Sequence, residues 1–288
     1  MSSPSFKEIY EPLMAIGEVC GDVVPRSEIY NETWMLRLTM TLLKSSRNID
    51  VILEDGEKET EVIREICNAV QYGWISEGGL KPIFDGGMEK TTWTDAILGS
   101  VKLDKEKRSV EVCDKASQGG VIVVEAKMAS KLSSGVTHSK SYNQIVRNIA
   151  CLSRLVLESR HVLGPNLEET SRVVVLAPKS KIDKWKDKAG RLIKQWKEDA
   201  DEMASKIKEI IIADKRYKSG LWKRPNDTEF LGNFNKIVQT ISQKSCVISW
   251  ESILSFIKCH PCMHDDFSRL AEYYETTKKI YGIKSVKY

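Results

Sequence analysis

Long apolar runs are missing from this chain of 288 residues. A helix that crosses a membrane needs roughly 18 to 20 consecutive apolar residues, and no run in the sequence approaches that length. The first residues also lack the basic segment followed by an apolar stretch that marks a secretory signal. Hydrophobic residues make up 41% of the chain and charged residues 29%, which is ordinary for a globular protein. We therefore expect a soluble, cytoplasmic protein without a membrane partner.

Glycine-rich nucleotide-binding fingerprints are absent as well. The glycine pairs Gly78-Gly79 and Gly86-Gly87 belong to neither G-x-x-x-x-G-K-[ST] nor G-x-G-x-x-G, the patterns whose backbone amides cradle phosphates. No G-x-S-x-G occurs either, so the nucleophile turn of the α/β-hydrolases is not indicated. The sequence therefore does not predict a P-loop enzyme, a dinucleotide-dependent enzyme or a serine hydrolase.

A disulfide framework is not indicated, because the chain has seven scattered cysteines and no secretory signal. We expect reduced thiols. The only cluster of soft metal ligands is formed by Cys259, His260, Cys262 and His264. A structural zinc site needs a closed set of four ligands, and four ligands from one hexapeptide would be strained. Zinc binding there is left open as the weaker interpretation.

The net charge of +4 says little about partners, but its distribution says more. Residues 179–224 hold 15 Lys and Arg against 8 Asp and Glu. A basic segment on an otherwise near-neutral chain suits a polyanion. The alternative is a solvated helix face. In the same segment, Trp185 and Trp196 are expected to belong to the core and not to a base-stacking surface.

The apolar patterning predicts alternating helices and strands. Helices are expected over residues 27–44, 59–71, 139–158, 182–214, 226–243, 251–258 and 265–281, and strands over 92–101, 108–113, 120–128, 172–177 and 245–250. Continuous β-branched runs are typical of strands covered on both faces. We therefore expect an α/β fold with a mixed central sheet flanked by helices. Residues 1–178 would form the core, and 179–288 a helical extension with a late strand, either as a separate unit or within the same domain.

Two charged side chains interrupt the clearest strand. Side chains alternate along a strand, so Glu125 and Lys127 leave the same face as Val121 and Val123. Lys127 is the only lysine of the chain with an acid two positions before it. Asp95 lies in the preceding predicted strand, and two carboxylates on neighbouring strands can share Mg²⁺. The alternative is an ordinary ion pair at a strand end.

The segments WTDAIL (93–98) and VIVVEAK (121–127), followed by a predicted helix and strand, resemble the PD-(D/E)XK nuclease superfamily. The resemblance covers about residues 27–178 and implies a restriction-endonuclease-like core. One position departs from the family pattern, because Thr94 stands where the family has proline.

The resemblance assigns roles to the residues of the motif. Asp95, Glu125 and the Ala126 carbonyl would hold Mg²⁺, with Mn²⁺ able to substitute. Lys127 would activate or orient the attacking water, leaving a 5′-phosphate. We expect the catalytic side chains to converge in a solvent-open cleft and not in the packed core.

Two flanking residues complete the predicted site. By resemblance, Glu32 of the first helix would add a metal ligand, and Gln144 would touch phosphate or orient the lysine. The alternatives are a solvated acid favoured by the helix dipole for Glu32 and an exposed amide for Gln144.

The expected function is therefore a metal-dependent nuclease, a DNA endonuclease of the restriction or defence type, with DNA favoured over RNA. One alternative is a nucleic-acid-binding module with a nuclease-like fold and little or no activity. Another is an interaction protein that assembles through the helix over residues 182–214. A homodimer is left open.

Overall fold

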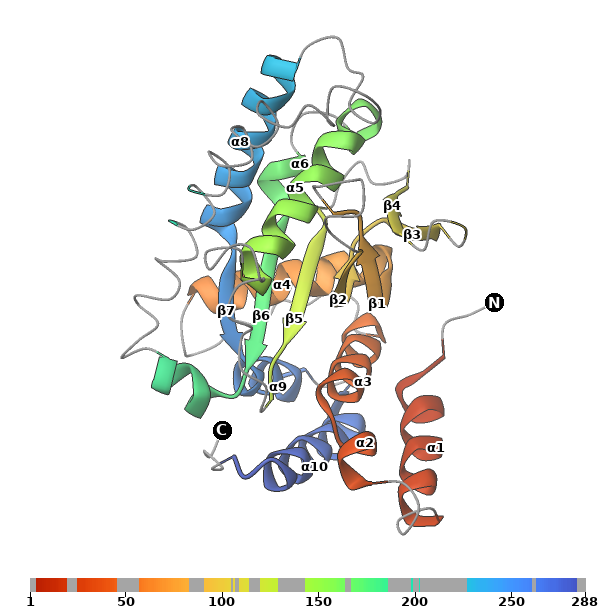
Figure 1. The fold of residues 1–288 in the computed structure, drawn as a ribbon. Helices are drawn as coiled ribbons and strands as arrows, with labels where there is room; N and C mark the ends of the chain where they lie inside the picture. Colours follow the sequence, from red (N-terminus) through yellow and green to blue (C-terminus); the bar gives the residue numbers. More distant parts are fainter. Residues whose placement is uncertain are drawn as a thin grey trace.

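The computed structural model describes residues 4–19, 25–45, 57–82, 91–104, 106, 109–113, 120–128, 143–163, 167–185, 198, 202, 227–260 and 263–283. Its centre is a five-stranded mixed sheet of order β1-β2-β5-β6-β7 (Figure 1). The antiparallel part comprises β1 (Trp74–Leu80) and β2 (Thr92–Leu98). β5 (Ile122–Ala126), β6 (Arg172–Ala177) and β7 (Cys246–Ser249) run parallel. The predicted α/β fold with a mixed, helix-flanked sheet is confirmed.

Both faces of the sheet are covered, as the continuous apolar strands predict. One face packs against α3 (Glu32–Ser45), α4 (Glu57–Tyr72), α9 (Trp250–Lys258) and α10 (His264–Ile280), with α1 (Phe6–Val19) outside them. We call this apolar layer the α3-side core. The opposite face carries the α5-side core, formed by α5 (Gln144–Leu163), α6 (Leu167–Thr170) and α8 (Asp227–Lys244). Figure 1 shows α4 behind the sheet and α5 and α8 in front of it.

The sequence predicts one helix over 27–44, but the chain forms two. α2 (Arg26–Ile29) ends at Ile29, and α3 begins at Glu32, directly after Asn31. The side-chain oxygen of Asn31 accepts a hydrogen bond from the Trp34 amide at 3.0 Å. An asparagine before the first turn is a strong N-terminal cap. The cap explains the new start at α3, which the broad apolar coverage of this segment hides.

The strand predicted over 92–101 ends early, at Leu98. Gly99 has a φ of +123°, and a Cβ there would meet the carbonyl oxygen of Gly120 at 2.6 Å. Only glycine fits such a turn. The chain therefore leaves the main sheet, and β3 (Val101–Asp104) pairs with β4 (Ser109–Val112) in a separate hairpin.

The segment after residue 178 contributes to the same sheet and core. β7 pairs with β6, and α9 and α10 pack into the α3-side core. Residues 179–185 are helical, but most of the predicted 182–214 helix lies outside the described residues. No helix in the described part of the chain is long and apolar enough to span a membrane. None of the five cysteines with described side chains forms a disulfide bond within the described residues.

Candidate functional site

Two carboxyl groups meet where β2 and β5 run side by side. The strand register pairs Ala96 with Val124, so the next step along both strands sets Asp95 beside Glu125. Glu125 lies one residue before the end of β5. This end of the sheet is marked by the arrowheads of β5 and β6 in Figure 1. The fold therefore brings together the two acids that lie 30 residues apart in the sequence.

Three side chains donate hydrogen bonds to Glu125. Lys127 Nζ donates to Oε1 at 2.5 Å, and Gln144 Nε2 donates to the same oxygen. Asn148 Nδ2 donates to Oε2 at 3.2 Å. Gln144 and Asn148 are four residues apart, so they lie one above the other on the same side of α5. The helix therefore fixes the orientation of the carboxylate with two amides.

Asp95 is bound to the backbone of the neighbouring strand. Its Oδ2 accepts a hydrogen bond from the Ala126 amide at 2.7 Å. The next amide, that of Lys127, donates to the Leu176 carbonyl of β6 at 2.7 Å. In a strand, the amide and carbonyl of one residue point to the same edge, and those of the next residue point to the other edge. The carbonyl of Ala126 therefore faces β2, as its amide does.

The structure also brings Glu32 and Lys181 into the electrostatic neighbourhood of the site. Glu32 begins α3, and its charge acts on Asp95, Lys127 and Lys181. Lys181 Nζ donates to the Met128 carbonyl at 3.2 Å. Burial lowers the pKa of Lys181, and the nearby Lys127 lowers it further. Acidic and basic groups thus gather at this end of the sheet.

Burial raises the pKa values of both acids, and the charge of Asp95 adds to the shift of Glu125. The pKa of Glu125 rises to about 7, first because the carboxyl is buried and then because Asp95 is close. The pKa of Asp95 is also raised, chiefly by burial, although its hydrogen bond from Ala126 opposes that shift. Burial disfavours the ammonium of Lys127, but the charges of Glu125, Asp95 and Glu32 outweigh it and raise the pKa of Lys127. Near neutral pH, Lys127 is charged and Glu125 is poised to exchange a proton.

The expectation of a solvent-open cleft is wrong for the central pair. Only 1% of Glu125 and 7% of Lys127 are exposed, whereas Asp95 is partly exposed. The amides of α5 lie against the Glu125 carboxylate. A charged pair this far from water is stable because each member contacts the other and further hydrogen-bond partners.

The oxygen donors fit a small divalent cation. Mg²⁺ commonly binds one or two carboxylates and keeps several waters, and raised pKa values are what two close carboxyl groups acquire when no cation separates them. The buried Oδ1 of Asn148 has no hydrogen-bond partner among the described atoms. In the ranges that the structure describes, no three or more His, Cys, Asp and Glu side chains form a group that could hold a metal. Glu32 therefore does not complete a three-carboxylate set with Asp95 and Glu125 in this structure.

Other predicted features are placed only in part. Cys259 is exposed and His260 is buried, whereas Cys262 and the side chain of His264 lie outside the described residues. Trp185 packs against the α5-side core, as predicted. Trp196 and most of the basic segment 179–224 also lie outside the described residues.

Two residues near the acids were not predicted from the sequence. Asn148 could have been found, because it follows Gln144 by one helical turn on the helix after the E-x-K strand. Lys181 carries no such signal. It reaches Met128 only because β5 and β6 are paired and the chain after β6 turns back toward the end of β5.

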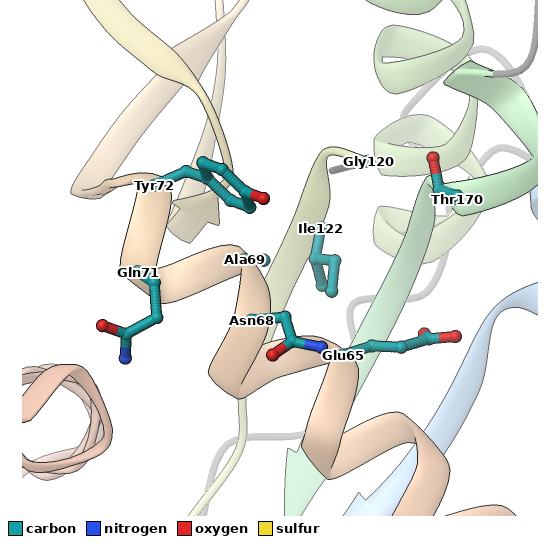
Figure 2. A pocket seen from close by; sticks show the side chains of 8 residues that line it. All are labelled: Glu65, Asn68, Ala69, Gln71, Tyr72, Gly120, Ile122 and Thr170. Atoms are coloured by element: carbon teal, nitrogen blue, oxygen red, sulfur yellow. The ribbon is translucent and has the colours of Figure 1, made fainter. Parts of the chain in front are cut away.

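A separate cavity of about 430 Å³ lies at the opposite end of β5. Figure 2 shows α4 side chains on one side of the cavity, and the start of β5 and the end of α6 on the other. The cavity is lined by Glu65, Asn68, Ala69, Gln71, Tyr72, Gly120, Ile122 and Thr170. Its one acid, Glu65, is paired with Arg172 at 2.5 Å. The acid and lysine cluster, and not this cavity, therefore holds the groups suited to phosphate chemistry.

Comparison of the chain with protein-family models, with curated proteins and with solved structures found no match.

Proposed function

We propose that this chain is a metal-dependent nuclease of the PD-(D/E)XK type that hydrolyses phosphodiester bonds of DNA in the cytoplasm. The observation that carries the proposal is the meeting of Asp95, Glu125 and Lys127 at one end of the sheet, with Lys127 bonded to Glu125. The antiparallel β1–β2 pair leading into parallel β5 and β6 supports a restriction-endonuclease-like core.

Each group has a role in this proposal. Asp95, Glu125 and the Ala126 carbonyl would hold the cation, Mg²⁺ or Mn²⁺. When bound, the cation would supply positive charge to the scissile phosphate and lower the pKa of water. Lys127 would orient the attacking water and stabilise negative charge that develops at phosphorus. Gln144 and Asn148 would keep the Glu125 carboxylate directed toward the cation, as outer hydrogen bonds do for metal ligands generally.

A second candidate is a nucleic-acid-binding module without activity. Glu125 is buried, and its oxygens accept three hydrogen bonds. This favours the inactive candidate, because a cation and a substrate must be able to reach a catalytic carboxylate. The exposed part of Asp95 and the raised pKa of Glu125 favour the enzyme. A cation bound by both carboxylates would offset the cost of burying their charges and would reduce the repulsion between them.

The test is a cleavage assay with linear, circular and single-stranded DNA and with RNA, each in Mg²⁺, Mn²⁺ or EDTA. Glu125→Gln removes the carboxylate while keeping its shape. Glu168→Gln is a matched control, because Glu168 is also buried but lies in α6, away from the site. We expect metal-dependent cleavage by the wild type and the control, and none by Glu125→Gln.

Two outcomes would contradict the enzyme. Cleavage that survives Glu125→Gln in a folded protein would place the activity elsewhere. Binding of nucleic acid without cleavage in either metal would favour the inactive binding module.

A further inference from the structure

An uncovered aromatic ring lies beside the acid cluster. Trp93 is 53% exposed and stands two residues before Asp95 on β2, about 6.6 Å away along the strand. Its cross-strand neighbour on β1 is Gly79, which has no side chain to cover the ring. Large apolar side chains are usually buried, so a bare indole at this place needs an explanation.

The strands change their side-chain phase around the site. Ile75 and Ile97 pair with each other and pack in the α5-side core. Farther along the same pair, Leu80 lies in that core too, and its partner Thr92 accepts a hydrogen bond from Cys151 of α5. Each strand advances five residues between these points. An uninterrupted strand would turn the fifth residue to the opposite face, so both strands shift phase in the stretch that contains Asp95.

The backbone of Glu77 accounts for the shift on β1. Its φ of 55° is the only positive value at a non-glycine residue in the part of the chain that the structure describes. The register places Glu77 across from Asp95, at the position that the β1–β2 pairing skips. Arg37 of α3 secures this point, since its Nη2 lies 3.2 Å from the Glu77 carboxylate and its Nε donates to the Ser76 hydroxyl at 2.9 Å. Strained backbone of this kind gathers at functional sites.

One consequence is that Trp93 and Asp95 share the less buried side of β2. Along this strand Trp93 is exposed and Asp95 partly exposed, whereas Thr92, Thr94 and Ala96 are buried. The ring is therefore presented next to the carboxylate that would face the scissile phosphate.

We infer that Trp93 is a stacking platform for an unpaired base next to the scissile phosphate, and that the substrate is single-stranded nucleic acid or a single-stranded segment of it. This inference rests on the proposed function. In a duplex, both faces of a base are stacked on its neighbours, so a flat aromatic ring can engage a base only where the strand is unpaired. Every base has such a face, so Trp93 selects strandedness and not sequence. The ammonium of Lys127, whose charge interacts with Asp95 on the neighbouring strand, would meet the phosphate that follows the stacked base.

Binding in EDTA tests the inference without any chemistry. Fluorescence anisotropy would measure the affinity of the wild type, Trp93→Ala and Trp93→Phe for a labelled single strand and for a labelled hairpin duplex. Stacking of one base on an aromatic ring is worth roughly tenfold or more in affinity. We expect Trp93→Ala to weaken single-strand binding about tenfold, Trp93→Phe to keep most of it, and duplex binding to stay unchanged. Tyr72→Ala is the matched control, because Tyr72 is 47% exposed but lies at the other end of the sheet.

The outcomes separate the inference from the proposed function. Equal single-strand affinity of Trp93→Ala and wild type overturns the platform, and so does an equal loss for single strand and duplex. If the wild type cleaves but Trp93→Ala leaves the KM for single strands unchanged, the inference fails alone. If Trp93 binds single strands but no metal supports cleavage, the proposed function fails and the platform stands.

Discussion

Glu125 takes up a proton as the pH falls through neutrality, because burial and the charge of Asp95 raise its pKa to about 7. The unfolded chain releases that proton near pH 4.5, so between these values the folded state binds more protons. The contribution of this group to stability is therefore complete at low pH and is lost as the pH rises through about 7. The two close acids therefore lower stability at higher pH, and a cation bound there under the proposed function would reverse the effect.

We predict that Glu125→Gln changes how stability depends on pH. In EDTA, the free energy of unfolding of the wild type should fall by on the order of 1–3 kcal/mol between about pH 5 and pH 8 relative to the variant. Urea denaturation at both pH values would measure the difference. Glu168→Gln serves as the control and should follow the wild type. Parallel pH profiles of Glu125→Gln and wild type would show that the Glu125 carboxyl does not titrate in this window.

We predict that Lys127→Ala and Glu125→Ala impair cleavage by different routes. Loss of Glu125 removes an oxygen ligand, so Mg²⁺ affinity should drop. Loss of Lys127 should reduce turnover by roughly 10²–10³ while the metal still binds. Lys127 lowers the pKa of Glu125, so calorimetric titration of Mg²⁺ should be done near pH 9, which favours the ionised carboxylate when Lys127 is absent. Loss of metal affinity in Lys127→Ala at that pH would argue against its role at the water.

At the level of single elements, the kink in β1 decides how β2 presents Asp95. A left-handed conformation at a residue with a Cβ carries a free-energy penalty of about 1–3 kcal/mol. Glu77 adopts it where the partner strand carries the acid, and Arg37 of α3 holds it there. The same helix begins with Glu32, whose charge reaches the site. Helix α3 therefore influences the acid cluster in two ways: through the charge of Glu32 at its start and through the contact of Arg37 with Glu77 in its second turn.

We predict that Glu77→Gly stabilises the fold and keeps the site. Glycine adopts a positive φ without penalty, and the exposed ion pair with Arg37 contributes little, so stability should rise by about 0.5–1 kcal/mol. Glu77→Val has a branched Cβ that resists this conformation and should lower stability by more than 1 kcal/mol. Thermal melts would measure both variants, with the cleavage rate as a second readout. Destabilisation by glycine would mean that the Arg37 contact, and not the backbone, governs this turn.

Across the whole molecule, a buried ionic network joins the C-terminal helices to the sheet end that bears the site. Lys278 of α10 is fully buried, with its Nζ 3.1 Å from Glu275 and 3.7 Å from Glu251 of α9. The other oxygen of Glu251 accepts the Lys179 amide at 2.8 Å. Lys179 is two residues before Lys181, which contacts Met128 beside the acid cluster. The position of the chain after β6 therefore depends on α9 and α10.

We predict that Lys278→Ala lowers the free energy of unfolding by about 3–5 kcal/mol, because it leaves the Glu251 charge buried without its cation. The neighbouring Lys279→Ala is the control. Lys279 is exposed, and its loss should change stability by less than about 0.5 kcal/mol. Urea denaturation would measure both. Similar small losses in the two variants would show that the network contributes little to the fold.

The sequence by itself determined the elements whose signals are local. Residues 172–177 form a strand with the predicted bounds, because a continuous β-branched run has few other stable conformations. The predicted strand 120–128 holds β5, and the helix after it begins at Gln144. The alternation of side chains also predicted that Glu125 and Lys127 would lie together, and the two are bonded. Strand periodicity depends on neighbours in the chain, so it can be read without the fold.

The tertiary structure alone decided what depends on contacts between distant segments. Helix α1 was not predicted, since it contains Pro12 and derives its stability from packing in the α3-side core. The burial of Glu125 follows from the way α5 crosses the sheet, and the reversal at Glu77 follows from pairing with β2. The approach of Lys181 requires β6 to lie beside β5. Such arrangements are fixed by the free energy of the assembled core, to which residues far apart in the chain contribute together.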